Sequence, residues 1–274
     1  MSRSLVQQAA RLIRASGREA CCDAPTAQLA GISARAFPDT RELARHVDLI
    51  LVFGGDGTML RIARETAGLR APILGVKVGG LGFLTTIQSR DLARSLAKIW
   101  KGDYKIDTRH LIEARIRSRK GEAPMKALND FVIGRGDVSR LVELDVKVDD
   151  ETLTRYRCDG LIISSPTGST AYSLAAGGAV VSPKADVLAI TPICPHTLSN
   201  RSVIVNSHSI VRVEVASRTL QTILTADGQV QAPLEPGDIV ELSRSRRSIQ
   251  LLRLEGGAFF TALRQKLHWS GSNV

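Results

Sequence analysis

The sequence predicts two fold classes in succession, an α/β part over the first hundred residues and a mostly β part after it. In the first part, helical patterns alternate with short apolar runs, which is typical of a parallel sheet covered by helices. In the second part, apolar and polar residues alternate at every second position, which indicates antiparallel strands with one face in water. With 274 residues, 43% of them hydrophobic, the chain can bury one large core or two smaller ones.

The elements of the α/β part follow from apolar spacing and turn residues. Apolar residues from Leu5 to Ile13 recur at helical spacing, and Gln and Arg residues interrupt them, so we predict a helix and not a secretory signal. Helices are predicted over about 5–15, after Asp39-Thr40, over about 58–67 and over 91–100, and strands over 49–53 and 73–76. This alternation predicts a parallel α/β unit.

The β part begins beyond Lys101. Residues 142–148 and 211–215 alternate valine or leucine with charged residues, as strands with one buried face do. The sequence Glu235-Pro236-Gly237-Asp238 is a turn signal inside this region. Helical spacing returns over residues 259–269.

The chain is basic, with 37 Lys+Arg against 27 Asp+Glu and a net charge of +10. This excess fits an anionic ligand, such as phosphates or nucleic acid, or a solvated Arg-rich surface, and on charge alone we favour the surface. Aromatic residues make up only 4% of the chain, so stacking platforms for single strands are scarce. The densest basic cluster, Arg244 to Arg247, is too short for a nucleic-acid tail, and we expect no nucleic-acid partner.

Cysteine, histidine and hydropathy patterns limit the class further. The four cysteines form no CxxC pair and the five histidines show no metal spacing, so we expect neither a disulfide framework nor metal-ligating side chains. The longest apolar runs fall short of the ~18 residues that span a membrane. We therefore expect a cytoplasmic protein with no membrane partner.

A predicted strand, a glycine turn and a predicted helix meet at GGDGT, residues 54–58. Gly54, Gly55 and Gly57 allow close approach of the backbone, and the following helix points unpaired N–H groups at the turn, which suits a phosphate. The single carboxylate, Asp56, can equally be the N-cap of that helix. A cap needs no glycine on both sides, so the three glycines favour a ligand. Neither GxxxxGK[ST] nor GxGxxG occurs in the chain.

Three further segments could carry chemistry. Gly75–Ile87 combines glycines with apolar residues, which is unusual for a plain surface loop. The pair Asn129-Asp130 can bind ribose hydroxyls or form an Asx turn, and standing alone it would favour the turn. Residues 157–183 place several Ser and Thr hydroxyls near a predicted helix start, which makes a polar, uncharged cradle. GxSxG is absent from the chain, so a serine hydrolase is disfavoured.

Together these segments resemble the NAD kinase family. The shared motifs run in the same order from about Asp48 to Trp269: GGDGT, LGFL, the Asn-Asp pair, CDGLIISSPTGSTAYSLAAGG, ITPICPHTLSNR, DGQ and LRQKLHW. GGDGT alone is weak evidence for this family, because diacylglycerol-kinase-like and phosphofructokinase-like enzymes carry similar turns. The Thr-Gly-Ser-Thr-Ala-Tyr-Ser run is highly specific.

The resemblance implies a fold and a reaction. The fold is a Rossmann-like α/β domain over 1–102 and a β-rich, sandwich-like domain over 103–255, with a tail of about 256–274 returning to the first domain. The reaction transfers the γ-phosphoryl group of ATP to the 2′-hydroxyl of the adenosine ribose of NAD, giving NADP. Mg²⁺ and a homodimer or homotetramer are implied with it.

The resemblance also assigns roles to residues. Asp56 matches the general base, Gly57 lines the NAD site beside it, and Asn129 and Asp130 match the NAD-contacting pair. Further ligand-contacting positions align with Arg140, Arg157, Asp159, Gln229 and the run Thr170, Ala171, Tyr172, Ser173, Leu174 and Ala175. A ribose hydroxyl is a poor nucleophile and benefits from a positioned carboxylate that accepts its proton. In-line phosphoryl transfer also needs neutralised charge, normally supplied with Mg²⁺.

Three residues or segments are less settled. Arg61 has two interpretations of equal weight: it assists at the phosphates, or it is a solvent-facing helix residue. Lys77 stands where the family pattern has Asn. The first helix begins within a few residues of Met1, whereas family members commonly open on a strand, so we expect a weakened sheet edge in the first domain.

Two other functions stay open at this point. A GGDGT-type kinase of a lipid or sphingoid acceptor would need an apolar acceptor pocket, whereas the cradle at 170–173 is polar. A non-catalytic dinucleotide sensor would bind NAD without turnover. The sequence also leaves open whether polyphosphate replaces ATP, whether NADH is accepted and whether NADP feeds back.

Overall fold

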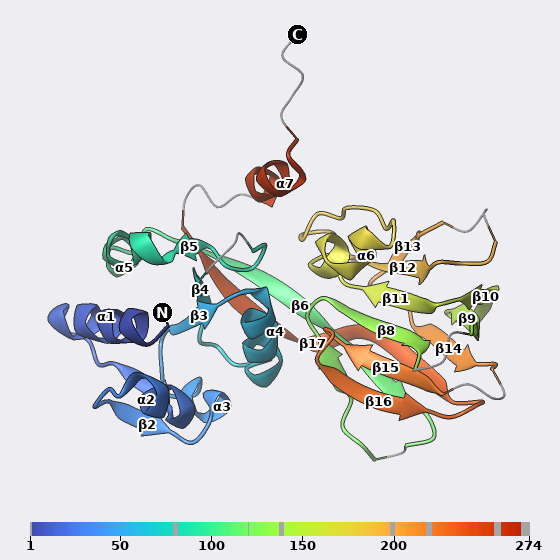
Figure 1. Ribbon diagram of the computed structural model, residues 1–274, viewed down its shortest axis with the longest axis horizontal. Coiled ribbons are helices and arrows are strands. Elements are labelled where there is room, and N and C mark those ends of the chain that lie inside the picture. The colour runs from blue at the N-terminus through green and yellow to red at the C-terminus, as the bar shows by residue number, and fades with distance from the viewer. Residues whose placement is uncertain are drawn as a thin grey trace, which may run out of the picture. The chain divides into compact units, whose positions relative to one another are not determined.

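The structure is a computed structural model that describes residues 2–78, 82–119, 121–136, 140–197, 201–217, 221–254 and 259–269 (Figure 1). The chain divides into two compact units, Met1–Arg109 with Ser248–Val274, and His110–Arg247. These boundaries fall a few residues away from the predicted ones, after residues 102 and 255. The predicted fold class is confirmed, with α/β structure in the first unit and β structure in the second.

Among the described residues, every helix longer than about one turn lies in the first unit. Its elements are α1 (Ser2–Ala15), β1 (Cys21–Asp23), α2 (Ala24–Ala30), β2 (Arg35–Phe37), α3 (Thr40–Leu43), β3 (Ile50–Gly54), α4 (Asp56–Glu65), β4 (Ile73–Lys77), β5 (Ile87–Gln88), a 3-10 turn (Ser89–Asp91), α5 (Leu92–Trp100) and α7 (Phe259–Leu267). Strand β6 (Lys105–Ile116) begins in this unit, and β17 (Ile239–Arg253) ends in it.

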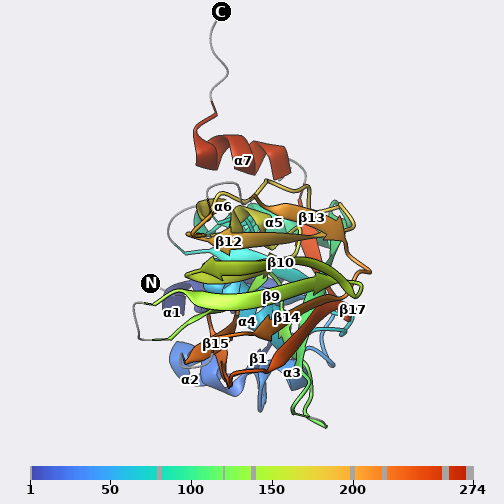
Figure 2. The same ribbon diagram turned by 90° about the vertical axis from the view of Figure 1, so that its right-hand side faces the viewer.

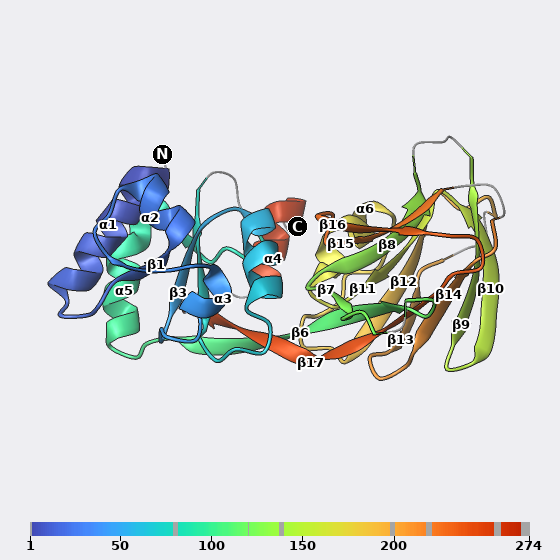
Figure 3. The same cartoon turned by 90° about the horizontal axis from the view of Figure 1, so that it is seen from below.

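A parallel sheet of β3, β4 and β5 forms the centre of the first unit. Strand β17 also pairs with β4 in parallel, with Leu251 beside Ile73 on the edge of β4 that faces away from β3. Alternate residues of β4 face opposite sides of the sheet. Leu74 and Val76 are fully buried against apolar residues of α1 and α5, which lie side by side in Figure 3. Gly75, between them, faces Met59 of α4. Helices therefore cover both faces of this sheet.

The described β1 and β2 form a separate parallel pair, and β3 is the end strand of its own sheet. The weakened sheet edge that the sequence predicts for the first unit stays a prediction. The sequence missed the segment from Cys21 to Phe37, because strands of three residues carry too little periodicity to detect. Its helix has clear caps in the structure, since the Asp23 side chain accepts from the Thr26 N–H and Gly31 ends the helix with φ of 60°.

The second unit is built from antiparallel strands. They are β7 (Met125–Ala127), β8 (Asp130–Arg135), β9 (Val142–Val148), β10 (Glu151–Cys158), β11 (Gly160–Ser164), β12 (Val187–Ile193), β13 (Val203–Asn206), β14 (Val211–Val215), β15 (Thr222–Ala226) and β16 (Val230–Leu234), with one-turn helix α6 (Tyr172–Ala175). Strands β10, β9, β14 and β17 pair in that order, and β13, β12, β11, β8, β15 and β16 form the other sheet. Figure 2 shows β9, β10 and β14 side by side.

The core of the second unit lies between its two sheets. Leu144 and Val213 from one sheet share a single apolar cluster with Ile133, Leu161 and Ile190 from the other. In β9 and β14 the buried residues occupy alternate positions, as the predicted alternation requires, whereas β11 is buried at every position. The unit is thus a sandwich of two packed sheets.

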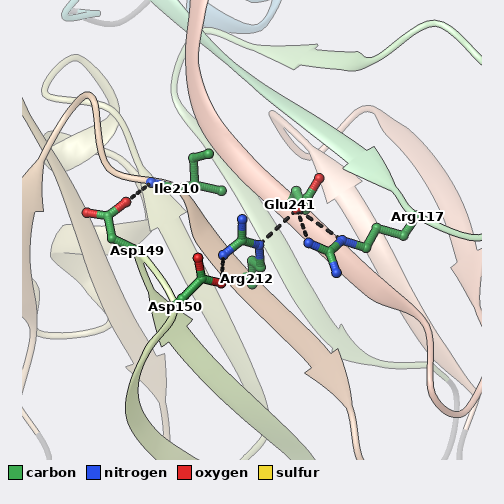
Figure 4. Close-up of polar contacts among 6 residues, drawn as sticks. All are labelled: Arg117, Asp149, Asp150, Ile210, Arg212 and Glu241. Atoms are coloured by element: carbon green, nitrogen blue, oxygen red, sulfur yellow. Dashed lines mark hydrogen bonds and ion pairs between the residues drawn. The ribbon is translucent and has the colours of Figure 1, made fainter.

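Polar contacts join three strands on the other face of the first of these sheets (Figure 4). The Glu241 carboxylate of β17 accepts from the guanidinium of Arg117, at 2.6 and 3.0 Å, and from Arg212 of β14 at 2.8 Å. Arg212 also pairs with Asp150 in the β9–β10 turn, where Asp149 accepts from the Ile210 N–H at 2.8 Å. Both turn aspartates have positive φ, as a tight hairpin requires.

Among the described residues, no helix combines the length and the apolar character needed to cross a bilayer.

Candidate functional site

The GGDGT turn connects β3 to α4, and its carboxylate does not cap the helix. Asp56 is the first residue of α4, and Gly55 occupies the N-cap position without a side-chain bond. The capping alternative is therefore wrong. Instead, the two carboxylate oxygens of Asp56 accept from the backbone N–H groups of Phe83, at 2.7 Å, and Leu84, at 3.2 Å.

These two bonds join the first glycine segment to the second. A bond from a backbone N–H to a carboxylate is charge-assisted and stronger than a neutral one. The approach depends on Gly82, because a Cβ at that position would lie 1.9 Å from Asp56 Oδ1. Leu81 and the two glycines before it, which belong to the same predicted motif, lie outside the described residues. The sequence singled out both segments but did not predict that one carboxylate holds them together.

The remaining predicted residues of the first unit lie on the surface of α4. Gly57 is exposed, next to Asp56. Arg61 is exposed and forms an ion pair with Glu65 at 2.9 Å, one turn further along the helix. Such i,i+4 pairs stabilise a helix by only a few tenths of a kcal/mol, about 0.3–0.5. This contact favours the surface interpretation of Arg61.

The second unit contains a cavity of about 320 Å³. It lies between the start of β8, the segment before α6 and the β15–β16 turn. Its lining residues are Asn129, Asp130, Val132, Ala171, Tyr172, Thr225, Asp227 and Gly228. The structure thus brings the predicted pair Asn129-Asp130 to the same cavity as Ala171 and Tyr172. Tyr172 is 47% exposed, so its ring is open to a ligand.

Asp227 fixes the backbone of this cavity. Its carboxylate accepts from three successive N–H groups, those of Leu128 at 3.1 Å, Asn129 at 2.7 Å and Asp130 at 3.4 Å. Its own N–H donates to the Asp130 carbonyl at 2.9 Å. Asp227 has a φ of 50°, which is uncommon for a residue with a side chain and marks a constrained turn. Sequence reasoning placed Gln229 in the site and missed this role of Asp227.

Asp130 and Asp227 place two acids close together in a buried setting. Asp130 is only 4% exposed. Burial, with a smaller contribution from the charge of Asp227, raises the pKa of Asp130 to about 7. Near neutral pH, Asp130 can therefore donate a hydrogen bond as an acid or accept one as a carboxylate.

The hydroxyl-rich segment is held mainly by its own side chains. Ser165 donates to the Leu128 carbonyl at 2.6 Å, and Ser169 donates to the Pro166 carbonyl at 2.8 Å. Ser173 is fully buried and contacts the Thr191 hydroxyl at 3.1 Å. The backbone at Gly168 passes so close to Asn129 that a Cβ would lie 2.1 Å from its carbonyl oxygen. The hydroxyls of these serines bind groups of the chain itself, so fewer of them are available to a ligand than the sequence predicts.

The other predicted positions lie around or away from the cavity. Arg157 pairs with Glu143 at 3.1 Å and Asp159 with Arg135 at 3.4 Å, so both are engaged in ion pairs. Arg140 and Gln229 are exposed. Thr170 ends a 3-10 turn, Gly168–Thr170, and Leu174 and Ala175 lie in α6, so these three residues flank the lining residues in sequence. The lining of the cavity includes Asn129, Asp130, Ala171 and Tyr172 and none of these other predicted residues.

Comparison with known proteins identifies the family. The pattern of the ATP-NAD kinase N-terminal domain matches residues 6–104, and that of the ATP-NAD kinase C-terminal domain matches residues 128–254. The chain belongs to the NAD kinase family. The NAD kinase of Syntrophotalea carbinolica is 43% identical over 258 residues, which covers 94% of this chain and 90% of that one. The NAD kinase of Symbiobacterium thermophilum is 45% identical over 222 residues, with 81% and 78% coverage.

Solved structures of NAD kinase relatives share the fold. Yeast NADH kinase complexed with NADH superimposes with a TM-score of 0.88 at 25% identity, over 99% of this chain and 85% of that chain. An NAD kinase from Archaeoglobus fulgidus in complex with ATP gives a TM-score of 0.73 at 24% identity, over 89% and 92% of the two chains.

Proposed function

We propose that Asp56 is the general base of a phosphotransferase whose acceptor is held by the Asn129-Asp130 cavity. Membership of the NAD kinase family makes the chain an enzyme that phosphorylates the 2′-hydroxyl of the adenosine ribose of NAD with ATP, giving NADP. The observation that carries the acceptor site is the cavity of about 320 Å³ at which Asp227 holds the backbone of Asn129-Asp130.

The geometry at Asp56 supports its role as a base. Two backbone N–H groups hold the carboxylate in one orientation, so it needs no rearrangement when a substrate arrives. A carboxylate has about four acceptor sites, and these two bonds leave others for a proton from a hydroxyl. The glycines around it leave room for the reacting groups. A positioned base of this kind contributes roughly 100-fold or more to a rate.

The cavity of the second unit supports a ribose and its base. Asn129 supplies an amide, and Asp130 supplies a carboxyl group that can donate or accept near neutral pH. The exposed ring of Tyr172 offers a flat apolar surface beside them. We propose that the run from Thr170 to Ala175 lies along the bound dinucleotide. Arg140, Arg157, Asp159 and Gln229 are proposed as outer contacts.

We propose Mg²⁺ as the cofactor, carried mainly by the phosphates of ATP. Among the described residues, no three His, Cys, Asp or Glu side chains cluster as metal ligands would. Mg²⁺ is commonly held by substrate phosphates and water with only one or two carboxylates, so it does not need a dedicated cluster of protein ligands. When bound, the ion neutralises charge on the transferred phosphoryl group. We further propose a homodimer or homotetramer in the cytoplasm.

The test is NADP formation by the purified chain supplied with NAD, ATP and Mg²⁺. Parallel reactions replace ATP with polyphosphate or NAD with NADH. Asp56→Asn should keep NAD binding and lower kcat about 100-fold or more, because an amide cannot accept the proton. Asp48→Asn removes an exposed carboxylate just before the same strand and should leave kcat unchanged. An Asp56→Asn enzyme with most of its rate would refute the role of Asp56.

A further inference from the structure

The Thr85 hydroxyl is buried near the Asp56 carboxylate, and among the described residues it has no hydrogen-bond partner. Thr85 directly follows the two residues whose N–H groups bind Asp56, and it is only 7% exposed. A buried hydroxyl normally bonds to the chain or to ordered water, so one without a partner needs an explanation. The place of this hydroxyl, next to the proposed base, points to a use during the reaction.

Two glycines fix the orientation of the Thr85 side chain. A Cβ on Gly75 of β4 would lie 2.9 Å from Thr85 Cα and 3.2 Å from its methyl carbon Cγ2, so the methyl group packs against β4. A Cβ on Gly82 would lie 2.7 Å from Thr85 Oγ1 and 1.9 Å from Asp56 Oδ1, so these two oxygens lie on the same side of Gly82. Because a β-branched side chain has few χ1 rotamers, the packed methyl group keeps the hydroxyl on the side of Asp56.

Three groups that interact with the Asp56 carboxylate are all hydrogen-bond donors. The Phe83 N–H donates to Oδ2 at 2.7 Å, and the Leu84 N–H donates to Oδ1 at 3.2 Å. Burial lowers the pKa of Lys266, and the charge of the nearby Asp56 raises it, but an ammonium group has three donors and no acceptor. These donors suit a carboxylate, whereas a protonated carboxyl group also needs an acceptor. The hydroxyl of Thr85 has the lone pairs that these three groups lack.

We propose that Thr85 is a positioning residue whose hydroxyl accepts a hydrogen bond from Asp56 once Asp56 holds the proton of the ribose hydroxyl. This inference rests on the proposed function, in which Asp56 is the base. In the reaction step, the ribose oxygen forms a bond to the γ-phosphorus of ATP, and ADP leaves with the electron pair of the broken bond. The hydroxyl proton passes to Oδ1 of Asp56, and the new O–H donates to Thr85 Oγ1. Thr85 itself neither gains nor loses an atom.

The timing of this hydrogen bond decides which kinetic constant it affects. An interaction accelerates the chemical step only when it is stronger in the transition state than in the ground state. Before proton transfer, the Thr85 hydroxyl has no partner among the described residues, and during proton transfer it gains one. Thr85 should therefore raise kcat and leave the binding of NAD and ATP unchanged.

A purely structural role for Thr85 makes different predictions. Replacing an unpartnered buried hydroxyl by a methyl group of the same shape should leave the Tm unchanged or raise it, whereas loss of a satisfied hydrogen bond should lower it. Thr86 supplies a matched control, because its Oγ1 is also buried and has no partner in the described part of the chain. The change from threonine to valine at position 86 replaces the same atoms one residue further along.

The experiment compares Thr85→Val and Thr85→Ser with Thr86→Val and the wild type, in steady-state kinetics and in thermal denaturation. We expect Thr85→Val to lower kcat about tenfold, the effect of one hydrogen bond, with both KM values unchanged and the Tm retained or raised. Thr85→Ser keeps the hydroxyl and should recover most of kcat, and Thr86→Val should match the wild type. Added to Asp56→Asn, Thr85→Val should lower kcat no further, because the base that it supports is already gone.

Three results would overturn the inference. One is a kcat of Thr85→Val equal to that of Thr86→Val, another is an equal loss of kcat in Thr85→Ser, and the third is a further tenfold loss when Thr85→Val is added to Asp56→Asn. A wild-type chain that formed no NADP would overturn the proposed function and this inference together. An active wild type with an unaffected Thr85→Val would overturn this inference alone.

Discussion

Asp130→Asn should remove a pH-dependent loss of stability from the second unit. Asp130 is 4% exposed and faces the carboxylate of Asp227, which accepts from the backbone N–H groups of Asn129 and of Asp130 itself. Burial first, and Asp227 second, raise its pKa from 3.8 to about 7. In the folded state Asp130 therefore keeps a proton that the unfolded chain releases.

The sign and size of the effect follow from linkage. Between the unfolded and folded pKa values the folded state binds more protons, so the free energy of unfolding falls as the pH rises from about 4 to 7. One pKa unit corresponds to about 1.4 kcal/mol, so this group removes roughly 2–3 kcal/mol of stability between pH 5 and pH 8. Asparagine has no proton to lose. The free energy of unfolding of the variant should therefore rise relative to that of the wild type by roughly 2–3 kcal/mol between pH 5 and pH 8.

Denaturant unfolding at several pH values between 5 and 8 measures this difference, with fluorescence and circular dichroism followed together. The quantity of interest is the free energy of unfolding of Asp130→Asn minus that of the wild type, because other titrating groups cancel in it. Asp103→Asn, at an exposed aspartate, serves as the control and should give a flat difference. A flat or falling difference for Asp130→Asn would show that burial beside Asp227 does not hold the proton.

Three further changes test the site and its support. Asp227→Asn should lower the free energy of unfolding by roughly 1.5–3 kcal/mol and raise KM for NAD, because a charged acceptor of three N–H groups is lost; an unchanged KM would show that this clamp does not shape the acceptor site. Gly82→Ala should lower kcat sharply with the circular dichroism spectrum retained, since its Cβ would displace the Asp56 carboxylate, and a fully active variant would contradict that contact. Glu241→Gln should cost about 1 kcal/mol, less in high salt, because the side chain of its partner Arg117 is 48% exposed and that of Arg212 is 17% exposed; a loss of several kcal/mol in urea unfolding would mean that the network is worth more than a surface ion pair.

The sequence predicted those parts of the fold whose patterns are long enough to read. The alternation over 142–148 and 211–215 corresponds to strands β9 and β14, and the apolar run before GGDGT corresponds to β3. The three-residue strands β1 and β2 were missed because a period needs more residues than that to appear.

Within the site, residue types were easier to predict than their partners. Asp56 stood out through its glycines, but its bonds to Phe83 and Leu84 join residues 27 and 28 positions apart, which no local pattern encodes. Asp227 accepts from N–H groups of residues 97 to 99 positions away, so the sequence did not predict its role in the site. The hydroxyls of Ser165 and Ser169 suggested a ligand, yet they bind the chain itself, because a serine carries the same signal whether its acceptor is a substrate or a backbone carbonyl.

The first unit is assembled from both ends of the chain, and this has a consequence for synthesis on the ribosome. The last residue of the second unit, Arg247, emerges before Leu251, the residue of β17 that lies beside Ile73. The second unit therefore has its whole sequence available while one edge of β4 still waits for its neighbour. An uncovered strand edge is a site of mispairing between chains. Nascent chains arrested before residue 248 should be the species most in need of chaperones, although they carry most of the polypeptide.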